Sequence, residues 1–387
     1  MVKVFDKPIV FVGLIFLIWR VLLVIIAAFS QLFIPVFGEK FPYWKEVLLQ
    51  PYYASWFWVW GNFDGVHYLR IAKDGYLAEF SQAFFPLYPT LIGFLGRVFA
   101  NEFLVAGFII SNFAFVLALF LLFKLFLEEF NLSVAKKAII LLLVFPTSFY
   151  FGSIYTEGLF LAEVLAAFYF AKKGKWLTAS IFGFFAALTR FIGVFLFPAL
   201  ILEFYLQNKK KFSIRNSLYI IRNTAWLLLI PAGLGLYMIY LAVEFGNPFY
   251  FLTAQPVFGA QRTAGEIVLF PQVVWRYLKI LFTVNPISLP FFNAIFEFII
   301  TISFLILILI SFAKTRISWA AFSFLAFITP TLTGTFSSMP RYVLVAFPAF
   351  LVLAQIKNKI FLTLILSIFG FLLMLTTILF VRGYWIA

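Results

Sequence analysis

Cysteine is absent from the chain, and histidine occurs once, at His67. The first absence excludes disulfide bonds and thiolate sites, and it leaves the redox compartment open. The second excludes a zinc site built on several histidines. Charge is also scarce, because 11% of the 387 residues are Asp, Glu, Lys or Arg, against roughly 25% in average soluble chains. A soluble globular fold is therefore excluded.

Long apolar runs take up most of the chain, and 64% of its residues are hydrophobic. Runs of about 18 or more apolar residues are typical of transmembrane helices. The first run, 8–36, is too long for the apolar part of a cleaved signal peptide, which has about 7–15 residues. We expect spans at 9–33, 103–125, 138–154, 157–171, 217–243, 286–312, 317–335, 342–356 and 360–380, with a hairpin of two short arms over 176–205.

These runs predict an all-α polytopic bundle with about eleven crossings, in one domain that covers residues 1–387. The first loop, 34–82, is rich in aromatics and proline, which suits a membrane interface. The apolar stretch 84–100 is interrupted by Pro86, Pro89 and Gly93. We interpret it as a re-entrant or tilted element that lines a cavity, because irregular backbone at membrane depth is tolerated there.

The placement of lysine and arginine orients this bundle. With the N-terminus inside, the inner segments hold most of the 29 basic residues and only four acids, Asp6, Glu128, Glu129 and Glu203. An excess of Lys and Arg is typical of cytoplasmic loops, so the net charge of +14 indicates topology and not nucleic-acid binding. The segments 34–82, 244–285 and 336–341, the turn at 189–190 and the C-terminal tail then share the outer face.

Polar residues concentrate at 60–76, in W-G-N-F-D-G-V-H-Y-L-R-I-A-K-D-G-Y. If 62–74 is helical, Asp64, His67 and Asp74 fall on one face, with Asp64 and His67 one turn apart. Asp74 would lie about 15 Å further along the axis. A carboxylate beside an imidazole suits a general base. The alternative is an interfacial acid that pairs with Arg70 or Lys73, and spacing alone does not separate the two.

Two arginines stand alone at the outer ends of apolar spans, Arg190 and Arg341. They suit a guanidinium fork for a phosphate at the membrane surface, or they snorkel to the interface. Arg276 and Lys279, one helical turn apart, form a second basic patch or a plain anchor. Glu157 either binds sugar hydroxyls or caps a helix N-terminus.

Eight pieces of the sequence, in order along nearly the whole chain, resemble the PIG-V family of GT-C-class integral-membrane mannosyltransferases. The pieces are F-D-G-V-H-Y-L-R-I-A-K-D-G-Y (63–76), A-F-F-P-L-Y-P (83–89), F-P-T-S-F-Y-F (145–151), Y-T-E-G-L-F-L (155–161), A-L-T-R-F-I-G (187–193), F-G-N-P-F-Y-F-L-T-A-Q (245–255), S-M-P-R-Y (338–342) followed by Phe347-Pro348, and G-Y-W-I-A (383–387). Phe63 stands where the eukaryotic motif has tryptophan, and the chain is shorter than the eukaryotic enzymes that act on GPI. Both departures put GPI in doubt as the acceptor.

The resemblance implies a GT-C-type fold and an inverting transfer with Asp64 as base, accompanied by His67. It implies a polyprenyl- or dolichyl-phosphate sugar donor, usually of mannose, and a lipid-linked or glycan acceptor. Tyr76, Gln255 and Tyr342 of the matching pieces join Arg70, Asp74, Glu157, Arg190, Arg276, Lys279 and Arg341 as candidate substrate-binding residues.

We expect no cofactor and favour no metal, because arginines suffice for a phosphate leaving group. The lack of cysteine and the reduced length favour a prokaryotic cell membrane. A lipid or sugar-lipid transporter is the main alternative, although its polar groups would be distributed through the bilayer. A non-catalytic assembly subunit is a third, and it predicts that Asp64 is dispensable.

Overall fold

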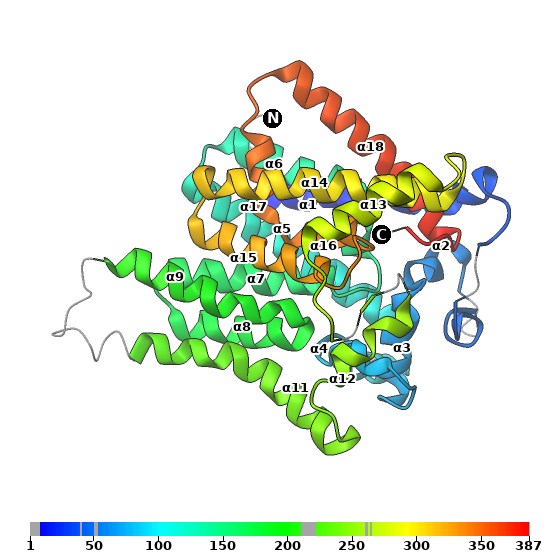
Figure 1. The fold of residues 1–387 in the computed structure, drawn as a ribbon, viewed down its shortest axis with the longest axis horizontal. Coiled ribbons are helices and arrows are strands. Elements are labelled where there is room, and N and C mark those ends of the chain that lie inside the picture. The colour runs from blue at the N-terminus through cyan, green and yellow to red at the C-terminus, as the bar shows by residue number, and fades with distance from the viewer. Residues whose placement is uncertain are drawn as a thin grey trace.

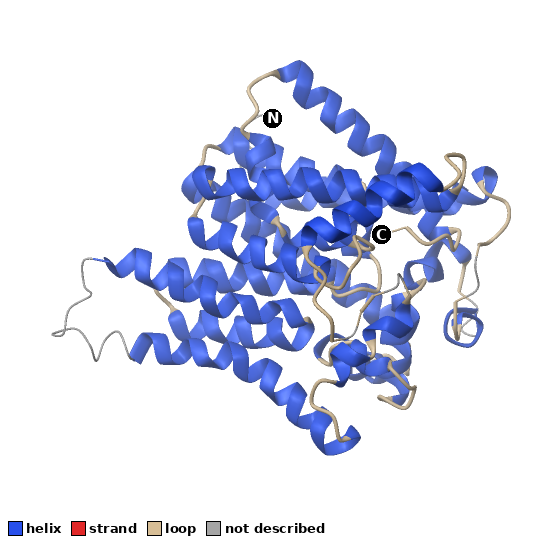
Figure 2. Ribbon diagram, viewed as in Figure 1, coloured by secondary structure: helices blue, strands red, loops and turns tan. Residues whose placement is uncertain are grey.

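The computed structural model describes residues 8–38, 41–49, 53–209, 222–259, 262–263 and 265–386. Helices dominate these residues, and no strand occurs among them (Figures 1 and 2). Six helical stretches of the described chain are long and apolar enough to cross a membrane: α1 (Pro8–Phe33), α5 (Phe103–Glu129), Phe191–Asn208, Arg222–Phe245, α14 (Leu289–Lys314) and α18 (Lys359–Val381). The predicted all-α integral-membrane bundle is confirmed, whereas the count of about eleven crossings is not.

Shorter helices fill the rest of the bundle and its ends. They are α2 (Ser55–Trp58), α3 (Asp64–Asp74), α4 (Leu87–Val98), α6 (Leu132–Val144), α7 (Glu157–Lys172), α8 (Trp176–Thr189), α9 (Leu196–Asn208), α11 (Leu229–Phe245), α12 (Tyr250–Thr253), α13 (Phe270–Thr283), α15 (Ile317–Thr331), α16 (Met339–Tyr342) and α17 (Phe347–Ala354). Single turns link them: η1 (Lys45–Leu49), η2 (Val59–Gly61), η3 (Ser81–Ala83), η4 (Ser148–Gly152), η5 (Phe191–Phe195), η8 (Trp226–Leu228), η9 (Gln255–Phe258) and η10 (Val343–Val345).

Helix α7 lies in the middle of the bundle, packed against α5 on one side and α8 on the other (Figure 1). Most of its residues are buried, which is typical of a helix that is apolar all around. Gly158 permits the close approach to α5, because a Cβ there would lie 2.8 Å from the carbonyl oxygen of Ser111. The first residue of α7, Glu157, is thereby fixed inside the protein.

Proline explains where the observed helices depart from the expected spans. The span expected at 138–154 ends as a helix at Val144, because Pro146 disfavours helical geometry at Phe145, which has ψ 139°. The span expected at 342–356 is divided into α16, η10 and α17, the last with Pro348 in its first turn. The proline-containing stretch 84–100 forms α4, whose 12 residues extend for about 18 Å. That is too short to cross a bilayer core of about 30 Å.

One end of the bundle is rich in lysine and holds the turns α7–α8 and α14–α15 (left in Figure 1). Of the four acids predicted to share a face with these basic residues, Glu128, Glu129 and Glu203 lie here and are paired with them. Lys173 contacts Glu128 at 2.7 Å, and Arg316 contacts Glu129 at 2.9 Å and also pairs with Glu203. Lys3, Asp6, Lys7, Lys210, Lys211 and Arg215, assigned to the same face, lie outside the described residues.

Candidate active site

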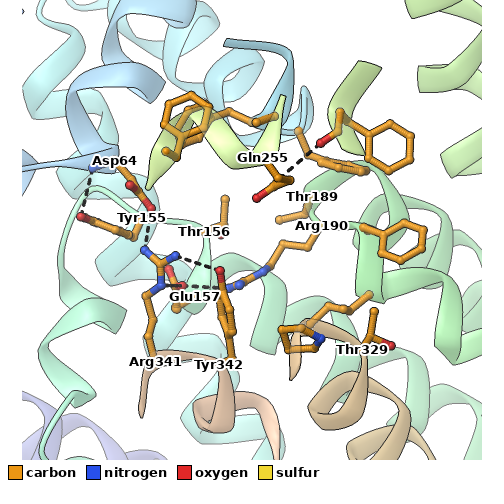
Figure 3. A pocket seen from close by; sticks show the side chains of 18 of the residues that line it. Asp64, Tyr155, Thr156, Glu157, Thr189, Arg190, Gln255, Thr329, Arg341 and Tyr342 are labelled. Carbon is orange, nitrogen blue, oxygen red and sulfur yellow. Dashed lines mark hydrogen bonds and ion pairs between the residues drawn. The ribbon is translucent and has the colours of Figure 1, made fainter. Parts of the chain in front are cut away.

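A cavity of about 220 Å³ lies at the opposite end, where most of the loops gather (Figures 2 and 3). Segments far apart in the sequence line it, including 64–68, 83–85, 155–157, 189–192, 251–258, Arg262, 329–333 and 341–342. Of the segments expected to share the outer face, 34–82, 189–190, 244–285 and 336–341 contribute wall residues, whereas the described residues of the C-terminal tail contribute none. The polar side chains on its wall are those of Asp64, Tyr68, Tyr155, Thr156, Glu157, Thr189, Arg190, Gln255, Arg262, Thr329, Thr333, Arg341 and Tyr342.

Helix ends place three of the charged residues. Asp64 is the first residue of α3 and Glu157 the first of α7, whereas Arg190 follows the last residue of α8. An N-terminus favours a negative charge and a C-terminus favours a positive one, because of the helix dipole. Arg341 comes from the short helix α16. The helix dipoles thus favour the negative charges of Asp64 and Glu157 and the positive charge of Arg190.

These four residues form one continuous row of alternating charge (Figure 3). Arg341 Nη1 donates to Asp64 Oδ2 at 2.6 Å, and Arg341 Nε lies 3.4 Å from Glu157 Oε1. The same Glu157 oxygen accepts from Arg190 Nη1 at 2.8 Å. The Glu157 and Arg341 side chains are 3% and 8% exposed, so these pairs are shielded from water. Oδ1 of Asp64 accepts no hydrogen bond from the described residues, which leaves one carboxylate oxygen for a ligand.

The backbone before Asp64 is strained. Phe63 has φ 58°, in the left-handed region that non-glycine residues seldom adopt. Tyr155 holds this turn, because its hydroxyl donates to Asn62 O at 2.9 Å and accepts from Asp64 N–H at 3.2 Å. Such strain costs about 1–3 kcal/mol and persists at functional sites where the surroundings fix it. Ser338, with φ 68°, starts α16 in the same way.

Arg262 is a cavity residue that was not among the predicted site residues, since its one signal in the sequence is that of an isolated charge, shared with Arg276 in 244–285. Its Nη2 lies 3.4 Å from the Tyr342 hydroxyl and 3.3 Å from Ser338 Oγ. Arg341 Nη2 lies 3.5 Å from the same hydroxyl. Burial raises the pKa of Tyr342, but Arg262, Arg341 and Arg190 outweigh it and lower this pKa to about 8. The potential at this hydroxyl is therefore strongly positive.

His67 lies one turn after Asp64, as expected, and α3 is helical over Asp64–Asp74. Its ring stacks on Phe84 with centroids 4.8 Å apart and meets Phe258 edge-on at 5.3 Å. Within the described residues no hydrogen bond joins His67 to Asp64. Burial lowers the pKa of His67, with the Asp64 charge opposing this shift and that of Arg70 adding to it. The imidazole is therefore mainly neutral near pH 7.

Asp74 does not line the cavity that holds Asp64, as the helical geometry predicted. Arg70 does not line it either. Both residues line a second cavity of about 520 Å³ together with Lys73. This cavity lies on another face of α3, since Arg70 and Lys73 project away from Asp64 at 100° per residue. The Arg70 guanidinium stacks over the Tyr43 ring at 3.7 Å.

Four further candidate residues differ in their relation to the cavity. Gln255 lines it, and its side-chain nitrogen lies 3.4 Å from Phe251 O. Tyr76 is not in the wall but donates to Phe84 O at 2.6 Å, next to wall residues. Arg276 donates to Gly334 O at 2.9 Å, beside the wall residue Thr333. Lys279 lies over the Trp275 ring at 5.4 Å, away from the cavity.

A comparison with protein families identifies the chain. The family model described as Mannosyltransferase (PIG-V) matches residues 9–200. The chain belongs to a PIG-V-like mannosyltransferase family. This PIG-V-like protein is therefore a membrane glycosyltransferase that takes a sugar donor and an acceptor. No match is found among curated proteins.

The matched half of this PIG-V-like enzyme carries Asp64, Glu157 and Arg190, whereas Arg262 and Arg341 lie beyond it. The cavity thus joins both halves of the chain. Within the part that the structure describes, no three His, Cys, Asp or Glu side chains are grouped closely enough to hold a metal ion.

Proposed function

We propose that this PIG-V-like enzyme transfers mannose from a polyprenyl- or dolichyl-phosphate donor to a hydroxyl of a lipid-linked or glycan acceptor, with inversion at the anomeric carbon. The row Asp64–Arg341–Glu157–Arg190 carries this proposal, because it sets one available carboxylate oxygen beside buried guanidinium groups. A base and an anion-stabilising group are the two functions that this transfer requires.

Asp64 acts as the general base. The acceptor oxygen attacks C1 of the mannose while its proton moves to Asp64 Oδ1. The bond between C1 and the phosphate oxygen breaks, and its electron pair leaves with the polyprenyl phosphate. The ion pair with Arg341 at 2.6 Å supports this role, because it holds Oδ2 and fixes the direction of Oδ1. The strained turn at Phe63 supports it too, since it fixes the start of α3.

The leaving polyprenyl phosphate gains negative charge as the sugar bond breaks. The arginines of the cavity stabilise this charge, so the step requires no general acid. We propose that it also proceeds without metal. Asp64 and Glu157 are the two carboxylates of the wall, and each is engaged by arginine. A wall with three arginines and two carboxylates does not favour a divalent cation.

The other candidate residues hold substrate or shape the wall. Gln255 and Tyr342 face the cavity, where Gln255 suits sugar hydroxyls and Tyr342 lies beside the arginines. His67 tunes Asp64 electrostatically and holds the Phe84 wall by stacking. Arg70 and Asp74 belong to the second cavity, where we place part of a bulky acceptor. Arg276 and Tyr76 support wall segments from behind, and Lys279 remains a basic group outside the wall.

We place the cavity on the outer face of a prokaryotic cell membrane, with the N-terminus in the cytoplasm. The lysine-rich end supports this orientation, because basic residues concentrate on cytoplasmic loops. The described cations of that end, such as Lys172, Lys175, Lys314 and Arg316, cluster opposite the cavity.

Reconstituted vesicles test the proposal. Wild-type protein is supplied with labelled polyprenyl-phosphate mannose or with a nucleotide-activated mannose, together with a membrane-glycolipid extract as acceptor source. We expect mannose transfer from the lipid-linked donor alone, with inverted configuration in the product. Transfer from the nucleotide sugar would overturn the donor assignment. Movement of the donor across the bilayer without transfer would instead favour a transporter.

A further inference from the structure

The charges that line the cavity do not balance. Asp64 and Glu157 are the acids of its wall, and Arg190, Arg262 and Arg341 are its bases. Arg341 pairs with both acids and Arg190 pairs with Glu157. Arg262 makes no ion pair within 4 Å to any described residue. One positive charge of the wall, on the half-buried Arg262, is thus left for a ligand that carries one negative charge.

We propose that Arg262 is the residue that binds the phosphate of the lipid-phosphate donor, with the Tyr342 hydroxyl beside it. This inference rests on the proposed function, because it assigns the anionic part of that donor to one group. A phosphodiester carries a single negative charge, so its binding neutralises the cavity. Arg341 and Arg190, each held by a carboxylate, then act chiefly on the charge that develops during the reaction.

The position of Arg262 suits this role. It lies 3.4 Å from the Tyr342 hydroxyl, so a phosphate between them would receive a guanidinium and a hydroxyl donor. The pKa of Tyr342, about 8 despite burial, shows how positive this point is, and Arg262 is the largest of the cationic causes. A phosphate bound here would be in the region where the positive potential is greatest.

The segment that carries Arg262 is fixed to the loop after α15. Thr263 N donates to Thr333 O at 3.0 Å, and Val268 N donates to Leu332 O at 3.0 Å. Arg262 Nη2 reaches Ser338 Oγ at 3.3 Å, at the start of α16. These contacts hold the guanidinium in place without neutralising it. A preorganised cation is more effective than one that must be ordered on binding.

Glu297 offers a competing explanation, in which Arg262 is only its counter-ion. Glu297 interacts electrostatically with Arg262, but its carboxylate accepts a hydrogen bond from Tyr277. It belongs to α14 and does not line the cavity. If Arg262 is only the counter-ion of Glu297, its loss changes the free energy of unfolding and nothing else. If Arg262 binds the phosphate, its loss also weakens the preference of the protein for polyprenyl phosphate over polyprenol.

A binding experiment separates these outcomes. Full-length protein in nanodiscs is titrated with a C55 polyprenyl phosphate and with the matching polyprenol. We expect wild type to prefer the phosphate and Arg262→Gln to lose this preference by about tenfold to a hundredfold, the range of one charge-assisted hydrogen bond. Arg262→Lys should retain part of it. Arg97→Gln, which removes an exposed arginine at the end of α4, should behave as wild type.

Failure of the inference is distinguishable from failure of the proposed function. If Arg262→Gln keeps the full preference, another residue binds the phosphate and the inference is wrong. If wild type shows no preference for polyprenyl phosphate, the proposal of a lipid-phosphate donor is itself wrong.

Phenylglyoxal labelling of wild-type arginines gives an answer even if a variant fails to fold. Polyprenyl phosphate, but not polyprenol, should protect Arg262, and equal labelling would contradict the inference.

Discussion

Glu157 connects the two arginines of the charged row, and its neutral substitution tests that connection. Its Oε1 lies 2.8 Å from Arg190 and 3.4 Å from Arg341, in a side chain that is 3% exposed. Glu157→Gln keeps the shape and one acceptor oxygen but removes the charge. Both guanidinium groups would then lose part of their fixed direction, and the cavity would gain one net positive charge.

The expected loss follows from these contacts. A hydrogen bond to a charged group contributes about 1.5–3 kcal/mol, and each 1.4 kcal/mol corresponds to about tenfold in rate. If the weakened contact to Arg341 misaligns Asp64, kcat falls by about 10- to 100-fold. The donor KM should stay the same or fall, because the added positive charge attracts the phosphate.

The assay is mannose transfer from polyprenyl-phosphate mannose, with kcat and donor KM measured separately. Glu163→Gln is the control for changing a buried carboxyl of α7 to an amide, since Glu163 lies in the same helix, is buried, pairs with no arginine among the described residues and does not line the cavity. It should leave both constants near the wild-type values. A raised KM with unchanged kcat in Glu157→Gln would refute the reasoning, because it would show that Glu157 binds the donor instead of holding Arg341.

Three further predictions concern residues around Asp64. Tyr342 is a neutral phenol below its pKa of about 8 and a phenolate above it, so donor KM should rise between pH 7 and pH 9 in wild type and not in Tyr342→Phe. Tyr155→Phe should lower the free energy of unfolding by about 1–3 kcal/mol, because the buried Asn62 O and the partly buried N–H of Asp64 both lose their partner; an unchanged melting temperature would contradict this. His67→Phe, which keeps the ring on Phe84, should retain more activity than His67→Ala.

The helical character of the chain could be predicted from the sequence, because long apolar runs and few charges leave no other fold. The grouping of basic residues at one end of the bundle could also be predicted, and Glu128 and Glu203 do lie with the lysine-rich turns. The boundaries were less predictable. Hydropathy extends across Pro146 and Pro348, whereas the helices stop or restart there for stereochemical reasons.

Composition and spacing identified Asp64, Arg190 and Arg341 as candidates, because isolated charges are conspicuous in an apolar chain. Their pairing could not be predicted, since Asp64 and Arg341 are 277 positions apart and meet only in the folded bundle. The role of Arg262 was hidden for another reason. Its importance comes from the lack of a carboxylate partner in the cavity wall, which is visible only once the other charges of that wall are paired.

The transfer rate of Asp64→Asn, in protein shown to bind the lipid-phosphate donor, tests the central claim most directly. The substitution keeps the size of the side chain and its contact with Arg341 but removes the basic oxygen. We predict that kcat falls by about 10²- to 10⁴-fold, the range for loss of a general base, while donor affinity is maintained. A kcat within about twofold of wild type, with the donor bound normally, would contradict the assignment of Asp64 as the base.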